Sequence, residues 1–312
     1  MKIAFIGAGA LASVFGSWLS KHNEVYMIDV DEQVVEHINR DGILLKEVDG
    51  TENCYKVKAF TDCSQLPEKP ELVILLVKNN MSKIALEGNR ALLEGDTKLM
   101  TLQNGGGNDK DCLEFVKPEN LFVGVAKVGS KSLGPGKAHN TSNIGVNIGS
   151  LCGNDAYGAV LEQLFCEAGF NAKYVGDPYY YVWDKLFLNV GYNAVCSIFM
   201  QPQVFVWESK WAQGIVRDLV HETVLTAAAD GYDFDEEKVM ESVLTAAKRG
   251  KEAYPSMLQD VLRKRRTEVD KINGFVSEKG REYGIPTPVN DMIVRIIHGI
   301  EDSYGSSRTA HL

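Results

Sequence analysis

The first half of the chain alternates between short apolar runs and stretches with helical periodicity. Strands are predicted over 2–6, 25–28, 71–78 and 98–103. Helices are predicted up to Lys21, over 82–93 and over 155–168. Strands that alternate with helices are typical of a parallel sheet covered on both faces. The segment 121–151, rich in Gly, Val and Asn, predicts antiparallel strands appended to that sheet.

After residue 178 the pattern changes to long helical segments. Helices are predicted over about 179–200, 208–230, 235–250, 256–283 and 287–303, with a frayed tail from Ser303 to Leu312. Gly176-Asp177-Pro178 is the best candidate for a domain boundary. We therefore expect an α/β domain with a mostly parallel, doubly wound sheet over 1–176, followed by an all-α domain over 177–312.

Composition agrees with two globular domains. The chain has 312 residues, of which 45% are hydrophobic and 24% charged. Its formal net charge of -9 argues against nucleic acid as a partner. Six cysteines without a C-x-x-C pair predict reduced thiols, and the histidines give no support to a metal site. We expect a cytoplasmic protein without a membrane span, although the run 2–19 also resembles the start of a signal peptide.

A glycine-rich turn follows the first predicted strand. The sequence Gly7-Ala8-Gly9-Ala10-Leu11-Ala12 lies between this strand and a helix, as in a dinucleotide-binding βαβ unit. Gly7 permits the turn, and Gly9 lets the backbone approach a pyrophosphate. The helix that starts near Ala10 and Leu11 presents free N–H groups to the phosphates. A glycine turn in some other α/β domain is the alternative.

Three polar residues follow predicted strands. Asp29 comes after the second strand, where a carboxylate can accept both ribose hydroxyls of NAD and repel the 2′-phosphate of NADP. Residues 30–32 include no Arg or Lys for that phosphate, so we predict NAD(H) over NADP(H). Lys78 and Asn104 also follow strands, where open α/β sheets bind ligands. A surface lysine and a turn asparagine are equally simple interpretations of these two.

The first helix of the second half carries a polar stripe. Lys185, Asn189 and Asn193 recur at every fourth position, and their neighbours are apolar, as in a buried helix. An unpaired buried amide costs about 1–3 kcal/mol, and a buried ammonium costs more. We therefore interpret the stripe as the wall of a substrate-binding cleft, with a solvated helix edge as the alternative.

Two residues of the segment 256–283 are further candidates. On a helical wheel Glu268 joins the apolar stripe, and an inward-facing acid needs a cationic partner such as Lys185. A Lys–Glu pair can deliver and regain a proton near neutral pH, although it can also be purely structural. Ser256, directly after Pro255, is expected to be a helix N-cap, and its hydroxyl could hold a substrate carboxylate.

The chain resembles the ketopantoate reductase (2-dehydropantoate 2-reductase) family over essentially its whole length. The matching motifs are G-A-G-A-L-A at 7–12, L-L-V-K at 75–78, N-G-G-G at 104–107, W-D-K-L-F-L-N-V-G-Y-N at 183–193, P-S-M-L-Q-D at 255–260 and R-T-E-V-D-K-I-N-G at 266–274. The resemblance implies a Rossmann domain joined to a helical domain like that of 6-phosphogluconate dehydrogenase, with the active site in the cleft between them. It also suggests a homodimer.

The resemblance implies roles for the candidate residues. Lys185 would be the general acid that protonates the ketone oxygen as hydride arrives, and Glu268 its charge partner. The residues implied at the substrate are Asn104, Asn189, Asn193 and Ser256. Asn104 and Lys78 would also lie on the cofactor side. The family's product is the D-2-hydroxy acid.

The chain departs from the family pattern at three places. The family usually uses NADPH and often has a basic residue where this chain has Asp29 and Val30. Asn193 is followed by Ala194 instead of Pro, and the nearest counterpart of an asparagine that can bind the pantoyl hydroxyl is Gln203. These departures favour a reversible NAD-dependent dehydrogenase similar to the family's D-mandelate dehydrogenases, acting on a C3-branched or aromatic 2-keto acid.

Two other functions stay open. The alternative enzyme is a ketopantoate reductase that forms D-pantoate, and the alternative from another class is a non-catalytic NAD-sensing module. A bulky apolar substituent would suit a pocket lined by Tyr192, Val195, Phe199 and Met200; the alternative is that these are core residues.

Overall fold

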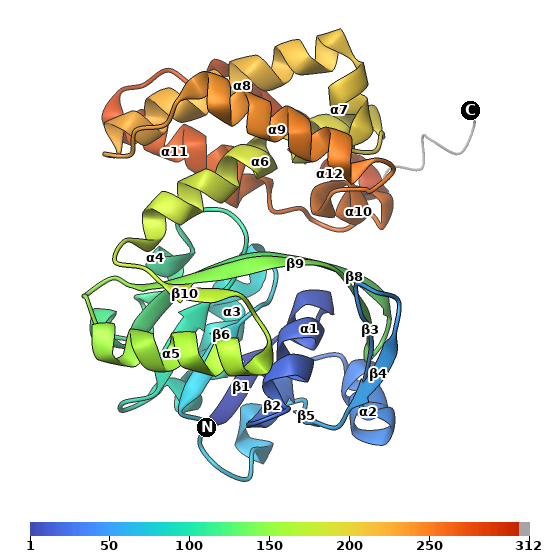
Figure 1. The fold of residues 1–312 in the computed structure, drawn as a ribbon, viewed down its shortest axis with the longest axis vertical. Helices are drawn as coiled ribbons and strands as arrows, with labels where there is room; N and C mark the ends of the chain where they lie inside the picture. The colour runs from blue at the N-terminus through green and yellow to red at the C-terminus, as the bar shows by residue number, and fades with distance from the viewer. Residues whose placement is uncertain (306–312) are drawn as a thin grey trace. The chain divides into compact units, whose positions relative to one another are not determined.

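The computed structural model describes residues 1–305, so 306–312 of the predicted tail lie outside the described residues. The chain forms two compact units (Figure 1). The first unit comprises Met1–Gln103 and Asn108–Tyr181, and the second comprises Asn104–Gly107 and the chain from Val182 onward. The division lies inside a helix, after Tyr181, rather than at the predicted border of residue 176.

The first turn of that helix, α6 (Pro178–Phe199), accounts for this position. A Cβ on Gly149 would meet the Pro178 ring at 2.6 Å, and the Tyr179 hydroxyl donates to Asp109. Because these contacts lie within the first unit, the start of α6 belongs to it.

A ten-stranded sheet forms the centre of the first unit within the described residues. Its order is β4-β3-β9-β8-β7-β6-β1-β2-β5, and β10 pairs with β9. The parallel central strands are β1 (Lys2–Ile6), β2 (Glu24–Ile28), β6 (Leu72–Leu75) and β7 (Lys98–Thr101). All four coincide with predicted runs, although β2 begins one residue earlier than its run, and β6 and β7 are shorter than theirs. The predicted fold class is therefore confirmed.

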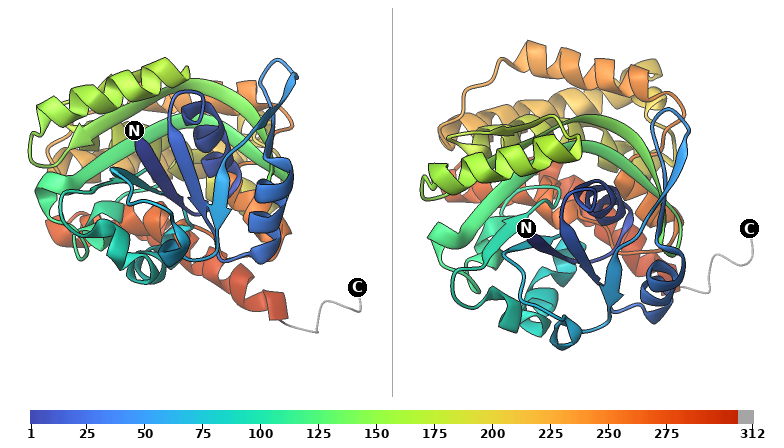
Figure 2. Two further views of the ribbon diagram at one scale, coloured as in Figure 1. Left: turned by 90° about the horizontal axis from the view of Figure 1, so that it is seen from below. Right: turned by 60° about the horizontal axis from the view of Figure 1, so that its bottom comes forward.

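Two long strands extend the sheet beyond β7. β8 (Leu121–Gly134) and β9 (Lys137–Ser150) pair antiparallel, as the pattern of 121–151 predicts. Register shifts near Lys127, Gly129 and Ser132 interrupt their pairing. Such bulges bend a ribbon, and the curvature of this green pair can be followed in Figure 2.

Four short strands were not predicted. They are β3 (Ile43–Lys46), β4 (Glu52–Tyr55), β5 (Lys58–Phe60) and β10 (Ala172–Tyr174). Runs of three or four residues contain too few alternations to produce a recognisable period. They all lie away from the parallel centre of the sheet, where less of each strand needs to be apolar.

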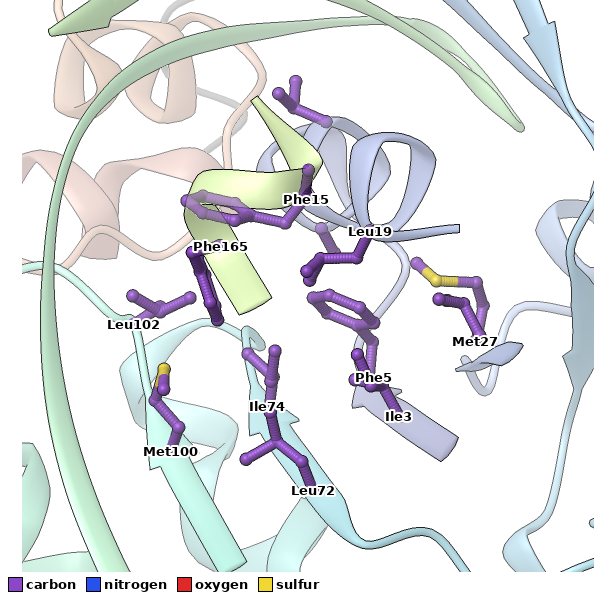
Figure 3. Close-up of a cluster of buried hydrophobic side chains, with 14 of the residues drawn as sticks. Ile3, Phe5, Phe15, Leu19, Met27, Leu72, Ile74, Met100, Leu102 and Phe165 are labelled. Atoms are coloured by element: carbon purple, nitrogen blue, oxygen red, sulfur yellow. The ribbon is translucent and has the colours of Figure 1, made fainter. Parts of the chain in front are cut away.

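Helices cover both faces of this sheet. α1 (Ala10–Leu19), α2 (Glu32–Asp41) and α5 (Asp155–Ala168) pack on the face that carries Ile3 and Phe5. Figure 3 shows Phe15, Leu19 and Phe165 of these helices pointing toward the strand side chains. The opposite face, with Ala4 and Ile6, packs against α3 (Ser82–Gly88), α4 (Asn108–Cys112) and the turn Arg90–Leu93.

The second unit is helical, as predicted. After α6 it contains α7 (Val204–Glu208), α8 (Lys210–Ala229), α9 (Glu236–Gly250), α10 (Ser256–Leu262), α11 (Asn273–Tyr283) and α12 (Pro288–Asp302). α6 supplies Trp183, Leu186, Phe187 and Val190 to a separate apolar core. Among the described helices, none is both long and apolar enough to cross a membrane.

The single helix predicted over 256–283 is wrong. α10 ends at Leu262, and the N–H groups of Arg263 and Arg265 both donate to the carbonyl of Asp260. Lys264 adopts a left-handed backbone with φ 53. The exposed cations of 263–266 offer no apolar face that could hold a further helical turn against the core.

Candidate active site

The glycine turn leaves space where a dinucleotide would bind. Gly7 has φ +98, and a Cβ there would lie 3.0 Å from the Leu76 carbonyl oxygen. Gly9 is the N-cap of α1, and a Cβ on it would meet no atom within 4 Å. The first N–H groups of a helix, here those of Ala10 and Leu11, lack intrahelical partners. The turn therefore fits a pyrophosphate at close approach.

Asp29 is fixed beside this turn. Its Oδ2 accepts a 2.7 Å hydrogen bond from the Ala8 N–H, and its Oδ1 accepts one of 3.0 Å from the Asp31 N–H. A carboxylate has about four acceptor positions, so two remain for other donors. The sequence predicted a ribose contact at Asp29 but not its support of the glycine turn.

Lys78 and Asn104 follow neighbouring parallel strands, as predicted. Lys78 comes after β6 and Asn104 after β7, and Leu75 of β6 pairs with Thr101 of β7. Gln103 connects the two strand ends, since its Nε2 donates to the Val77 carbonyl at 2.8 Å. Lys78 stays in the first unit, whereas Asn104 groups with the helical unit.

The loop 104–107 is attached to the helical unit through Lys271. The Gly106 N–H donates to the Lys271 carbonyl at 2.8 Å, and Lys271 Nζ donates to the Gly107 carbonyl at 3.0 Å. A Cβ on Gly105 would lie 2.1 Å from the Lys271 oxygen, and one on Gly106 would lie 2.4 Å from the Phe275 ring. Only glycine permits this approach, which fixes the position of Asn104.

Asn104 connects Lys185 to Glu268. Its Oδ1 accepts a 2.7 Å hydrogen bond from Lys185 Nζ, and its Nδ2 donates to Glu268 Oε2 at 3.3 Å. Glu268 is 8% exposed and directly precedes the 3-10 turn η5 (Val269–Lys271). The helical-wheel argument for Glu268 was therefore wrong about the helix, although the side chain is buried. We call these three candidate site residues the catalytic row.

The rest of the polar stripe continues along α6. Asn189 and Asn193 lie four and eight positions after Lys185. Asn193 is 2% exposed, and the Nδ2 of Asn189 is buried without a hydrogen-bond partner in the described structure. A buried donor without an acceptor is costly unless a ligand supplies one. This feature agrees with a binding role for the stripe.

Ser256 is not the N-cap that the sequence predicted. It is the first residue of α10, and Pro255 occupies the capping position without a side-chain hydrogen bond. Proline has no hydroxyl or carboxylate with which to cap a helix. The prediction was wrong by one position because it took the hydroxyl of Ser256 as the capping group. Ser256 is half-buried.

The four proposed pocket residues differ in their surroundings. Val195 is in the core, Tyr192 packs against it, and burial raises the pKa of Tyr192 to about 12. Phe199 and Met200 are exposed. The side chain of Gln203 lies against α9, where a Cβ on Gly250 would meet its Oε1.

A buried hydrogen-bond network between three helices of the second unit was not predicted. Glu222 of α8 accepts hydrogen bonds from the backbone N–H groups of Val289 and Asn290 at 2.8 and 2.9 Å. Its Oε2 also accepts from Asn290 Nδ2, and Asn290 Oδ1 accepts from Asn273 Nδ2 at 2.9 Å. The network joins α8, α12 and the start of α11. Glu222 could have been noticed as an acid among the apolar positions of its helix.

The architecture and the site define a class of protein. A Rossmann-type unit with an open glycine turn and a helical unit with a hydrogen-bonded lysine are features of a two-domain oxidoreductase. Residues 3–153 match the family model described as ketopantoate reductase PanE/ApbA, and residues 179–301 match the model of its C-terminal part. The chain belongs to the ketopantoate reductase family.

Individual relatives agree along nearly the whole chain. The 2-dehydropantoate 2-reductase of Lactococcus lactis subsp. lactis (strain IL1403) is 31% identical, over 97% of this chain and 98% of its own length. That of Aquifex aeolicus (strain VF5) is 28% identical, over 96% and 97%.

Solved structures give the same result. A ternary structure of D-mandelate dehydrogenase with NADH and anilino(oxo)acetate is 30% identical, with a TM-score of 0.91 over 97% of this chain and 99% of that one. The 2-dehydropantoate 2-reductase from Geobacter metallireducens GS-15 is 25% identical, with a TM-score of 0.89 over 96% and 99%. The chain is thus an oxidoreductase that acts on CH–OH groups, as predicted.

Proposed function

We propose that the chain reduces a C3-branched 2-keto acid to the D-2-hydroxy acid with a nicotinamide cofactor, and that ketopantoate is the first substrate to consider. The hydrogen-bonded catalytic row Lys185–Asn104–Glu268 is the observation that carries the proposal. Curated relatives named 2-dehydropantoate 2-reductases support this substrate over nearly the full length. The order of candidates from the sequence alone, with a mandelate-like activity first, is thereby reversed.

The cofactor would be held mainly by the first unit. Gly7 and Gly9 leave room for the pyrophosphate, and the N–H groups of Ala10 and Leu11 would donate to it. Asp29 would accept the ribose hydroxyls and repel a 2′-phosphate, which supports NAD(H) over NADP(H). Lys78 would contact the cofactor from the end of β6. When bound, the reduced nicotinamide supplies the hydride that the keto carbon accepts.

Lys185 would supply the proton. The keto oxygen becomes an alkoxide as the carbon gains hydride, and an ammonium within hydrogen-bond reach stabilises and protonates it. An ammonium can donate up to three hydrogen bonds, and one of those made by Lys185 goes to Asn104. On substrate binding Nζ would donate to the keto oxygen, and the resulting amine regains a proton from solvent.

Glu268 and Asn104 would orient this lysine. An ionised carboxylate only accepts hydrogen bonds and an ammonium only donates them. An amide between the two has therefore one favourable orientation, with Nδ2 toward Glu268 and Oδ1 toward Lys185. This arrangement keeps the acceptor directed at Lys185 and holds Nζ in one position.

The substrate would use the remaining polar groups of the helical unit. The buried Nδ2 of Asn189 offers an unpaired donor to an oxygen of the keto acid. Asn193 would border the substrate one turn further along α6. The hydroxyl of Ser256 would hold the substrate carboxylate.

A second candidate is oxidation and reduction of the D-mandelate type. Two observations favour it, namely Asp29 in place of a basic residue and the TM-score of 0.91 to a D-mandelate dehydrogenase that contains NADH. Such an enzyme would prefer benzoylformate or 2-ketoisovalerate to ketopantoate.

A substrate panel distinguishes the two candidates. We expect kcat/KM for ketopantoate to exceed that for benzoylformate and 2-ketoisovalerate, and NADH to be preferred over NADPH. A marked preference for benzoylformate would favour the second candidate. NADPH preference would contradict the role of Asp29, and absence of turnover with every 2-keto acid would reject the proposal.

We further propose a homodimer, as the family resemblance implies, and a cytoplasmic location, which the irregular spacing of the six cysteines supports. Light scattering should then give twice the chain mass of 34.5 kDa.

A further inference from the structure

One turn of α12 contacts the segment that carries Glu268 at positions both before and after Glu268. Glu301 Oε1 accepts a 2.7 Å hydrogen bond from the N–H of Thr267, which directly precedes Glu268. His298 Nε2 lies 2.8 Å from Oδ1 of Asp270, two residues after Glu268. The other ring nitrogen of His298, Nδ1, lies 3.1 Å from Glu301 Oε2. His298 therefore connects the two holding points.

The segment is also held by bonds within its own turn and by the buried side chain of Val269. It follows the exposed cations 263–266 and consists of a short 3-10 turn rather than a helix. Its local bonds run from the Val269 N–H to Thr267 Oγ1 at 3.3 Å, from the Lys271 N–H to the Glu268 carbonyl at 3.1 Å and from the Ile272 N–H to the Val269 carbonyl at 3.2 Å. Glu301 is buried, with a side chain 3% exposed, so its bonds are shielded from water.

We propose that His298 is a positioning residue for the reaction: as an imidazolium that donates to both Asp270 and Glu301, it holds the segment 267–270 and so keeps Glu268 against Asn104. This inference rests on the proposed function of Glu268 in the catalytic row. His298 itself touches none of the reacting groups that the row defines.

The bridge needs the charged form of His298. An imidazolium has two N–H donors, one for each carboxylate, whereas a neutral imidazole has only one. Deprotonation leaves a nitrogen lone pair facing a carboxylate oxygen, which is repulsive. The grip on the segment therefore weakens when His298 loses its proton.

Several groups around His298 affect this titration. Burial lowers its pKa, but hydrogen bonds to Asp270 and Glu301 raise it, and the net value is above the ordinary 6.5. Arg266 Nη1 lies 4.0 Å from Glu301 Oε2 and competes for that carboxylate. Burial and the nearby charge of Glu301 raise the pKa of the Tyr304 hydroxyl. Because the folded pKa is raised, the bridge is complete below 6.5 and is lost as pH rises through the folded value.

Three variants test the inference, and a fourth, Glu268→Gln, tests the proposed function separately. His298→Gln is neutral at every pH and has donors on one atom only, whereas His298→Arg keeps the charge and a forked set of donors. The matched control is His221→Gln, which removes another His–Glu pair, with Glu236 at 2.9 Å. The measurements are kcat and KM for 2-keto acid reduction from about pH 5.5 to 9, and amide hydrogen exchange of peptides covering 263–272.

We expect His298→Gln to lower kcat about tenfold near pH 6, as for the loss of a charge-assisted hydrogen bond, with little change in the KM of the cofactor. The ratio of wild-type to variant kcat should decline toward one as pH rises. Exchange at Thr267 and Val269 should accelerate by a similar factor. His298→Arg should restore both properties, and His221→Gln should alter neither.

Other results would contradict the inference. If peptides covering 263–272 exchange amide hydrogens equally fast in His298→Gln and in His221→Gln, then His298 does not hold the segment 267–270. The positioning role would be overturned if His298→Gln exchanged faster but kept the wild-type kcat, while Glu268→Gln showed a reduced kcat. If Glu268→Gln keeps full kcat, the proposed function of Glu268 fails instead, and hydrogen exchange still decides whether His298 holds the segment.

Discussion

Lys185 combines two roles that single substitutions can separate. Lys185→Ala removes both the charge and the proton donor, so kcat should fall about 10²- to 10⁴-fold. Lys185→Arg keeps a positive charge, but a guanidinium does not give up its proton in proteins. We expect the arginine variant to bind substrate while its kcat stays far below that of the wild type. Steady-state kinetics with the best substrate of the panel checks both outcomes.

Lys210→Ala is the matched control for these variants. Lys210 is an exposed lysine of the same unit, whose ammonium lies 5.0 Å from the centre of the Trp211 ring. Its loss should leave kcat within about twofold, as for surface substitutions. Full turnover by Lys185→Ala would reject the general-acid mechanism, whereas good turnover by Lys185→Arg would indicate that charge alone is sufficient.

The N-G-G-G loop is the element on which the geometry of the catalytic row depends. A methyl group at Gly106 would overlap the Phe275 ring, which is 1% exposed and cannot move into solvent. In Gly106→Ala the loop must therefore move away from the Phe275 ring, and Asn104 moves with it. Since a displacement near 1 Å can cost about 10²-fold in rate, we expect kcat to fall by ten- to a hundredfold.

A second glycine substitution provides the control. A Cβ at Gly214 in α8 would meet nothing within 4 Å, so Gly214→Ala should leave kcat unchanged and stabilise the helix by about 1 kcal/mol. Phe275→Leu in the Gly106→Ala background should recover part of the lost rate by making room. Wild-type kinetics in Gly106→Ala alone would show that the loop does not set the position of Asn104.

Sequence patterns predicted those elements whose limits have local causes. The observed helix Asp155–Ala168 has the predicted bounds, and both of its ends have local causes: the side chain of Asn154 caps its start, and Gly169 ends it with φ 108. The four central parallel strands, β1, β2, β6 and β7, were predicted from their continuous apolar runs. By contrast, the break after Leu262 depends on how the cations of 263–266 meet the surface of the folded unit, which a helical wheel does not represent.

The sequence also predicted those parts of the candidate site that lie on one element, but not the contacts between elements. Lys185, Asn189 and Asn193 share one helix, so their common stripe follows from spacing alone. Asn104 and Glu268 are separated by 164 positions, and their hydrogen bond depends on tertiary packing of the glycine loop against Lys271. The sequence identified both residues as unusual but contained no local signal that the amide would join lysine and carboxylate.

At the scale of the whole molecule, each unit has an apolar core of its own. Ile3, Phe5 and Phe165 belong to a core of the first unit, whereas Trp183 and Phe275 belong to that of the second. One fully buried thiol marks each unit, Cys112 in the first and Cys196 in the second. Separate cores allow the two units to differ in stability and in their response to ligands.

These two thiols can report where the cofactor binds. Burial raises the pKa of the Cys196 thiol to about 12, so thiol reagents near pH 8 should label it only after the second unit opens. Cys112 should likewise be labelled only when the first unit opens, whereas the exposed Cys54 and Cys152 react at every urea concentration.

If NADH binds through the glycine turn and Asp29, it stabilises the first unit more than the second. A ligand at about 100 times its Kd adds about 2.7 kcal/mol, which corresponds to a shift of about 1–2 M in the urea midpoint. We therefore expect NADH to raise the midpoint for labelling of Cys112 well above that for Cys196, as measured by pulsed alkylation and mass spectrometry. Equal shifts of both thiols would mean that the units unfold together, and a larger shift of Cys196 would contradict a cofactor site on the first unit.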